Sequence, residues 1–300
     1  MTHSEALAAV ELTGRRQYGV FSTEQALAAG VSYRMLNHHS LPGGRWRRVA
    51  PRVYEVLAQP ADWRRTLMAA LLWGGPEAVL CGQSAADLLD LDGIDRHVVE
   101  LYTPTGRPHP PWRIHRGQPS TVVMTKRLRH TGALQTLCDL TRVLDADHVE
   151  RAIESALRQR FVSEPELRAQ AALKRVMARR PPGAAPTESE LETRMVQWLR
   201  RVDVPEPVRQ YPLGQARLDF AFPDVGLAIE CDGRAAHATP VALVHDRHRQ
   251  NGIVGRGNWT VLHYTWADVV DHPLDTARKV AEAYRAHGDL TGAVPARARR

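Results

Sequence analysis

The sequence predicts a mixed α+β protein of more than one domain, and three observations support this fold class. A chain of 300 residues is too long for one small core. Helical spacing and strand-like alternation of apolar residues occupy separate segments. The Pro-, Gly- and Ala-rich stretch "RRPPGAAP" predicts a linker at residues 179–186. We therefore expect an N-terminal domain over 1–60, a mixed domain over 61–180, a third domain over 187–287 and a basic tail over 288–300.

Composition excludes several classes of protein. Hydrophobic residues make up 43% of the chain, as in ordinary globular proteins. No apolar run approaches the roughly 18 residues of a membrane span, and the N-terminus lacks the apolar segment of a signal peptide. We expect a cytoplasmic protein with no membrane partner. Cys81, Cys138 and Cys231 lie far apart and form no CxxC pair, so neither a disulfide framework nor a cysteine-rich zinc site is expected.

The net charge of +7 comes almost entirely from arginine, because the only lysines are Lys126, Lys174 and Lys279. The guanidinium group binds phosphate through a rigid fork, so this bias favours a nucleic-acid partner. A chain rich in Ala and Arg also results from GC-rich codons. Charge alone therefore leaves both explanations open.

The first domain reads as three helices followed by a strand ribbon. In "STEQALAAG", Ser22 and Gln25 form a capping box and Gly30 ends the helix. The next helix starts at Ser32, and "RWRRVAPRVYEV" predicts a two-stranded basic ribbon over 45–56. Two short helices at a tight turn, followed by a hairpin, indicate a winged helix-turn-helix.

On this interpretation, two groups of side chains would contact DNA. The groove-facing group is Arg34, Asn37 and His38, and the phosphate-contacting group is Arg45, Arg47, Arg48 and Arg52. The alternative is a small packing module with a solvated basic face.

The mixed domain over 61–180 shows no catalytic spacing. It alternates predicted helices and strands and ends in a series of helices, one of which opens with a capping box of Ser163 and Glu166. We expect a scaffold, or a surface for a homodimer or a partner protein. A further capping box, Thr187 with Glu190, opens the third domain.

The stretch "RLDFAFPDVGLAIECDG" predicts a hairpin with "PDVG" (223–226) as its turn. If Phe222 faces Leu227, then Asp219 faces Glu230 and, by the same count, Arg217 faces Asp232. The apolar face would hold Leu218, Phe220, Phe222, Leu227, Ile229 and Cys231, and the other face Arg217, Asp219, Ala221, Ala228, Glu230 and Asp232.

Opposed residues in such a pair have Cβ atoms about 4.5–5.5 Å apart, where like charges repel. Asp219 and Glu230 would therefore share a proton or hold a cation. Oxygen ligands alone favour Mg²⁺ or Mn²⁺ over zinc. The alternative is a solvated strand face on which Arg217 neutralises Asp232.

The combination "RLDFAF…LAIECDGRAAH…HDRHRQNGIVGRGNWTVLHYTWADVV" resembles the endonuclease-like domain of the PD-(D/E)XK superfamily, in the branch related to very-short-patch-repair endonucleases. The resemblance covers about residues 187–287. Upstream, the chain is similar to proteins that carry an AbiEi-type antitoxin N-terminal domain, a looser likeness of mostly apolar spacing.

The resemblance implies a restriction-endonuclease-like fold, a central mixed sheet flanked by helices, with a metal site at the hairpin. Asp219 and Glu230 match the metal-binding acids, and Glu192 on the preceding helix matches an additional acid of many members. Asp232 stands where the superfamily usually has a lysine, which orients the water or stabilises the developing charge, a role that an acid cannot take. In the repair-endonuclease branch histidine supplies some of this chemistry, and His237 occupies the matching place.

Together these features predict a Mg²⁺-dependent endodeoxyribonuclease that hydrolyses phosphodiester bonds and is brought to DNA by its N-terminal module. Arg247 and Arg249, on a basic helix beside the site, would contact flanking phosphates. The alternative is a winged-helix antitoxin or transcriptional regulator with an inactive nuclease-like domain. A third, weaker possibility is a nickase directed to mismatches or damage.

Overall fold

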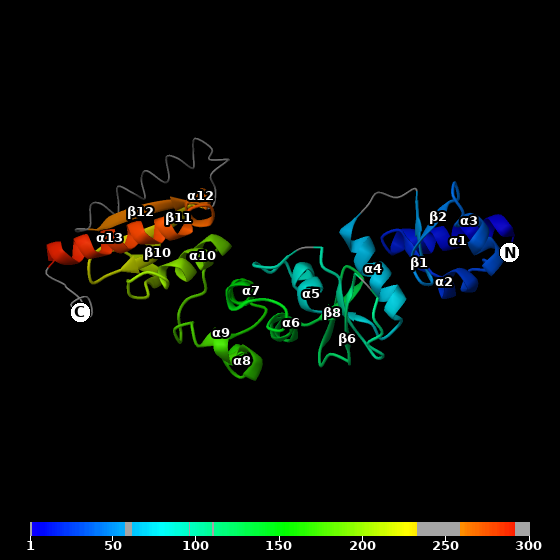
Figure 1. The fold of residues 1–300 in the computed structure, drawn as a ribbon, viewed down its shortest axis with the longest axis horizontal. Coiled ribbons are helices and arrows are strands. Elements are labelled where there is room, and N and C mark those ends of the chain that lie inside the picture. Colours follow the sequence, from blue (N-terminus) through cyan, green and yellow to red (C-terminus); the bar gives the residue numbers. More distant parts are fainter. Residues whose placement is uncertain (1, 58–61, 96, 110, 233–258, 292–300) are drawn as a thin grey trace. The chain divides into compact units, whose positions relative to one another are not determined.

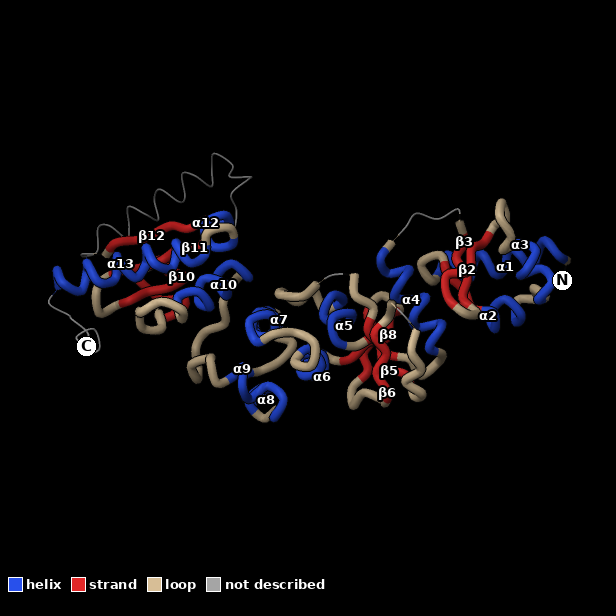
Figure 2. Tube along the Cα trace, viewed as in Figure 1, coloured by secondary structure: helices blue, strands red, loops and turns tan. Residues whose placement is uncertain are grey.

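A computed structural model describes residues 2–57, 62–95, 97–109, 111–232 and 259–291 of the chain (Figures 1 and 2). Helices and strands alternate along it, which confirms the mixed α+β class. The fold divides into two compact units, Met1–Leu144 and Asp145–Arg300. In the described part of the chain, no helix is long and apolar enough to span a bilayer.

The first unit begins with three helices and a small antiparallel sheet in the order β1-β3-β2. Its elements, in chain order, are α1 (His3–Arg16), β1 (Val20–Ser22), α2 (Thr23–Ala28), α3 (Tyr33–His39), β2 (Trp46–Ala50) and β3 (Val53–Val56). The predicted caps are confirmed, since Ser22 forms a capping box with Gln25 and Ser32 caps α3. Strand β1 was not predicted, because three residues are too few to show alternation.

A second sheet follows in the same unit, in the order β6-β5-β4-β8-β7. Its strands are β4 (Val79–Leu80), β5 (Glu100–Thr103), β6 (Arg113–Arg116), β7 (Val122–Thr125) and β8 (Leu128–Thr131), and the helices around it are α4 (Trp63–Gly74), α5 (Gly82–Leu88) and α6 (Ala133–Leu140). Helix α4 joins the two sheets, because its buried Leu67 lies in one core cluster with Val53 and Leu101.

The β7–β8 hairpin was not predicted. Its two-residue turn consists of Lys126 and Arg127, which have φ angles of 49° and 67°. Such turns normally carry Asn-Gly or Gly-Gly, because L side chains are disfavoured in the left-handed region. The usual turn signal is therefore missing from the sequence.

The second unit starts with a group of helices that the sequence places in the mixed domain over 61–180. They are α7 (Ala146–Arg158), α8 (Glu164–Arg168), η1 (Ala171–Leu173) and α9 (Lys174–Met177). The predicted linker at 179–186 is held by Arg180, which is 4% exposed and pairs with Glu154 of α7 at 3.1 Å. The boundary between the two compact units lies between Leu144 and Asp145.

The rest of the second unit is a mixed sheet in the order β12-β11-β10-β9, in which β9, β10 and β11 are antiparallel and β11 and β12 are parallel. The strands are β9 (Val208–Leu213), β10 (Ala216–Phe222), β11 (Leu227–Asp232) and β12 (Thr260–Thr265), and the helices are α10 (Glu190–Leu199), α12 (Trp266–Val270) and α13 (Pro273–Thr291). Helix α13 extends into the predicted tail.

One face of this sheet forms the core of the unit. Phe220 and Ile229 of the hairpin pack against Met195 of α10 and Tyr284 of α13 in a single buried cluster. Figure 1 shows both helices alongside the strands. The amino end of α10 is therefore fixed relative to the hairpin.

Candidate metal centre

Next to its turn the hairpin has the predicted register, but the paired segment ends at Phe220 and Ile229 and does not include the predicted opposition of Asp219 to Glu230 or of Arg217 to Asp232. Phe222 pairs with Leu227 and Phe220 with Ile229, on either side of the turn at 223–226. Phe220, Phe222, Leu227 and Ile229 all belong to the main core, as expected from strand alternation.

The side chains of Leu218 and Phe220, on either side of Asp219 in strand β10, do not lie in the same apolar cluster. The prediction that both belong to one apolar face was therefore wrong for Leu218. Leu218 packs with Ala228, Trp259 and Val261 rather than with Phe220. The pairing of β10 with β9 runs through Leu218 and resumes at Phe220, so it skips Asp219. A local irregularity of this kind re-aims one side chain while the rest of the strand keeps its register.

The Asp219 carboxylate lies against the neighbouring strand. Its Oδ2 accepts a hydrogen bond of 2.8 Å from the backbone N–H of Cys231. Cys231 stands between Glu230 and Asp232 in β11, so the three carboxylates gather at one end of the hairpin.

His263 joins this group and was not predicted. The parallel pairing of β11 with β12 places it beside Glu230. Its Nδ1 lies 3.4 Å from Oδ2 of Asp232 and 3.7 Å from Oε2 of Glu230. The alternation of "NWTVLHYTW" indicated a strand, but only the pairing partner of that strand identifies His263 as a site residue.

Glu192 lies in the first turn of α10, where Ser189 rather than Thr187 is the N-cap. Its carboxylate accepts hydrogen bonds from the N–H of Glu188 (2.8 Å), the hydroxyl of Ser189 (2.9 Å) and the amide of Gln210 (2.9 Å). The pKa of Glu192 is raised to about 7, mainly by burial and also by the negative charge of Asp219, although the hydrogen bonds from Glu188 and Ser189 act to lower it. Glu192 and Asp219 are therefore close enough to repel.

The partly buried thiol of Cys231 lies within the electrostatic influence of all four acids. Burial raises the pKa of Cys231 well above its ordinary value, and the charges of Asp219, Glu192, Asp232 and Glu230 add to this increase in that order. All four acids expected from the sequence thus act on one side chain.

The donor chemistry of these acids fits Mg²⁺ or Mn²⁺, since every oxygen is a carboxylate oxygen. Within the ranges that the structure describes, no three His, Cys, Asp or Glu side chains stand in a geometry that could hold a metal ion. Three predicted residues, His237, Arg247 and Arg249, lie outside the described residues.

Arg217 does not neutralise Asp232, contrary to the alternative interpretation of the strand face. It pairs with Glu188, and its position on β10 faces Pro212 of β9. Asp232 stays half exposed beside His263.

The DNA-contacting residues predicted in the first unit are exposed. Arg34, Asn37 and His38 lie on the outer face of α3, three and four residues apart, and Arg48 is exposed on β2. The other predicted arginines form ion pairs, Arg45 with Glu11 (2.9 Å), Arg47 with Glu55 (2.5 Å) and Arg52 with Glu24 (3.1 Å), although each remains more than half exposed.

Comparison with known proteins gives no function. No protein-family model matches the chain. The chain is similar to two proteins of Mycobacterium tuberculosis, "Uncharacterized protein MT2308" of strain CDC 1551 / Oshkosh and "Uncharacterized protein Rv2248" of strain ATCC 25618 / H37Rv. Each is 26% identical over 240 residues, which cover 75% of this chain and 88% of the relative.

Proposed function

We propose that this chain is a Mg²⁺-dependent endodeoxyribonuclease of the PD-(D/E)XK type, targeted to DNA by a winged helix-turn-helix. The position of the Asp219 carboxylate on the backbone N–H of Cys231, between Glu230 and Asp232 and next to His263, carries this proposal. Carboxylates so arranged repel one another, and a divalent cation is the simplest partner that relieves the repulsion.

Asp219 and Glu230 would hold the metal, which when bound lowers the pKa of a water molecule and offsets charge on the phosphate. Glu192, with a pKa of about 7, can accept or release a proton near neutral pH. Asp232 and His263 form a half-exposed pair that can orient a water molecule at the rim of the site. His237 remains the proposed proton shuttle.

The order of elements in the first 57 residues supports the targeting role. Helix, strand, two helices and a two-stranded hairpin follow each other as in winged helix-turn-helix domains. Arg34, Asn37 and His38 on α3 form an exposed polar strip that suits a DNA groove, and Arg48 is exposed on the hairpin. The ion pair of Arg52 with Glu24 is exposed on both sides and therefore weak, so a phosphate can replace Glu24 there. Arg45 and Arg47 pair with the largely buried Glu11 and Glu55, but their guanidinium groups are more than half exposed and accessible to a phosphate.

The test is cleavage of supercoiled plasmid by the full chain with Mg²⁺, Mn²⁺ or EDTA. Asp219→Asn and Glu230→Gln should each reduce cleavage by about 100-fold or more, because a bound metal contributes several kcal/mol to phosphoryl transfer. Both variants should retain DNA in a mobility-shift assay.

Glu188→Gln is the matched control. Glu188 is an exposed acid near α10 whose backbone N–H donates to Glu192 and remains in the variant, and its side-chain charge is the smallest of the influences on the pKa of Glu192. Its substitution should leave cleavage within about twofold of the wild type, since it removes only an exposed ion pair. Cleavage that persists in both Asp219→Asn and Glu230→Gln would refute the assignment.

A second candidate function is a DNA-binding regulator with an inactive nuclease-like domain. The carboxylate of Asp232, where the superfamily usually has lysine, favours it. Calorimetric titration of the full chain with Mg²⁺ discriminates between the two. Metal binding that disappears in Glu230→Gln supports the nuclease, and DNA binding with no metal binding supports the regulator.

A further inference from the structure

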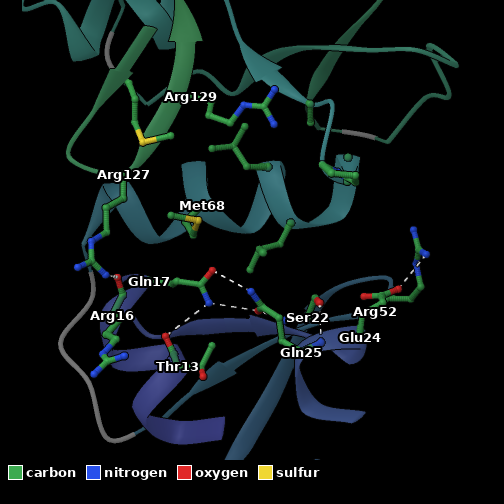
Figure 3. A pocket seen from close by; sticks show the side chains of 17 residues that line it. Thr13, Arg16, Gln17, Ser22, Glu24, Gln25, Arg52, Met68, Arg127 and Arg129 are labelled. Carbon is green, nitrogen blue, oxygen red and sulfur yellow. Dashed lines mark hydrogen bonds and ion pairs between the residues drawn. The ribbon is translucent and has the colours of Figure 1, made fainter. Parts of the chain in front are cut away.

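The first unit contains a basic cleft that the proposed nuclease site does not use. Its volume is about 950 Å³, which is within the range of ligand sites of roughly 300–1,000 Å³. One wall is formed by the end of α1, the start of α2 and the β2–β3 turn, and the other by α4 and the β7–β8 hairpin (Figure 3).

Four arginines line this cleft, and they come from three separate segments of the chain. They are Arg16, Arg52, Arg127 and Arg129, against one carboxylate, Glu24, which pairs with Arg52 at 3.1 Å. The lining therefore carries an excess of positive charge, which suits an anion with several oxygen atoms.

Two of these arginines occupy backbone positions that disfavour them. Arg127 in the β7–β8 turn has φ 67°, and Arg52 in the β2–β3 turn has φ 63°. Glycine or asparagine would adopt these angles with less strain. Both of these side chains line the cleft, so two strained turns place their charged side chains in the same space.

The cleft also has an apolar side. Met68 and Leu71 of α4 are nearly buried, and Met124 of β7 is 66% exposed. A ligand that fills this space needs an apolar, flat part beside its anionic part. A DNA duplex meets a protein with a convex phosphate surface, whereas a nucleotide presents one base and one phosphate group to a concave site.

The two walls are held together by contacts of the same hairpin. The Tyr18 hydroxyl donates to the carbonyl of Lys126 (2.6 Å), and Arg127 donates to the carbonyl of Arg16 (3.1 Å). On the lower wall, Gln17 and Gln25 exchange hydrogen bonds of 3.2 and 3.0 Å through their amides (Figure 3). The cleft is therefore a pre-formed polar site.

We propose that this cleft binds a nucleoside phosphate, with its phosphate on the arginines and its base against Met68 and Leu71. The ligand is a free nucleotide or the exposed nucleotide of a single DNA strand, which share this chemistry. The site lies in the first unit, so the proposal does not depend on the nuclease assignment.

The test is calorimetric titration of the full chain with AMP, ATP, adenosine, inorganic phosphate and a five-nucleotide single-stranded DNA. A nucleotide should bind more tightly than adenosine or phosphate alone, and raised salt should weaken it. Binding of AMP or ATP identifies a free nucleotide, and binding of the oligonucleotide alone identifies a DNA strand.

The decisive variant is Arg127→Gly, because glycine fits φ 67° and the relief of strain in the turn offsets the loss of the exposed hydrogen bond to the Arg16 carbonyl, so thermal stability should stay close to that of the wild type. The affinity for the probe that binds the wild type should fall about tenfold or more, as expected for loss of a charged hydrogen bond. Arg129→Gln should have a similar effect from the strand.

Lys126→Gly is the matched control. Lys126 is the other residue of the same turn, has φ 49° and the same charge, and does not line this cleft. The Lys126→Gly variant should bind the probe with the same affinity as the wild type. The Glu230→Gln variant, altered in the second unit, should do so as well. Equal affinity of Arg127→Gly and wild type, or no binding of any probe, would overturn the proposal.

Discussion

Two groups of acids in the second unit differ in their neighbours. On α7, Asp147, Glu150 and Glu154 each pair with arginine. At the hairpin, Asp219 and Glu192 instead repel each other.

The consequence is visible in the pKa values. Burial lowers the pKa of Arg200, but hydrogen bonds and charges from Glu206 and Glu150 raise it above its ordinary value overall. Burial and Asp219 together raise the pKa of Glu192 to about 7. Buried acids matched by guanidinium groups fasten α7 to the unit, whereas buried acids gathered beside other acids are poised to bind a proton or a cation.

The largest loss of stability is expected when one of the paired acids on α7 is neutralised. Glu154→Gln would leave the guanidinium groups of Arg180 and Arg209, which are 3% and 2% exposed, without the carboxylate they share. Loss of one partner of a buried ion pair costs about 3–5 kcal/mol, and urea denaturation should show a loss of stability of this size. Glu206→Gln, at a partly exposed acid that also contacts Arg209, should cost much less. Equal effects would show that burial does not set the strength of these pairs.

The second prediction concerns Glu192. In the folded state its pKa is about 7, against an ordinary value of 4.5. The folded protein therefore holds a proton that the unfolded chain releases, so this group destabilises the fold progressively between about pH 4.5 and pH 7. The effect amounts to about 3 kcal/mol, because each pKa unit is worth about 1.4 kcal/mol.

Glu192→Gln should remove this dependence. Relative to the wild type, its free energy of unfolding should rise by up to about 3 kcal/mol from pH 5 to pH 8, measured by urea denaturation in EDTA. The glutamine can still accept from the N–H of Glu188 and donate to the hydroxyl of Ser189. A difference that stays constant with pH would mean that Glu192 is ionised normally and that the contrast between the two groups of acids is not real.

The smallest effect is expected for Arg217→Ala. The side chains of Arg217 and Glu188 are 58% and 50% exposed, so their ion pair should contribute less than about 1 kcal/mol. Denaturation at low and high salt measures it. A larger loss, or a change in the pH dependence assigned to Glu192, would show that Arg217 acts on the hairpin acids after all.

Much of the candidate site followed from local rules. The turn at 223–226 places Phe222 opposite Leu227, because a hairpin turn fixes which residues of the two strands face each other. The alternation of side chains along a strand then assigns the neighbouring residues to one face or the other. Asp219, Glu230 and Asp232 were identified for this reason, and Glu192 from the resemblance. His263 was missed, because the pattern of "NWTVLHYTW" predicts a strand but does not indicate which strand it pairs with.

The sequence by itself determined the alternation of helices and strands, the caps at Ser22 and Ser32, and the bend that brings the hairpin acids together. These depend on hydrogen bonds and side-chain spacing within a few residues. Only the tertiary structure decided that α7 belongs to the second unit, that β12 supplies His263, and that Arg127 meets the end of α1. Those contacts join segments tens of residues apart, and burial rather than local propensity selects them.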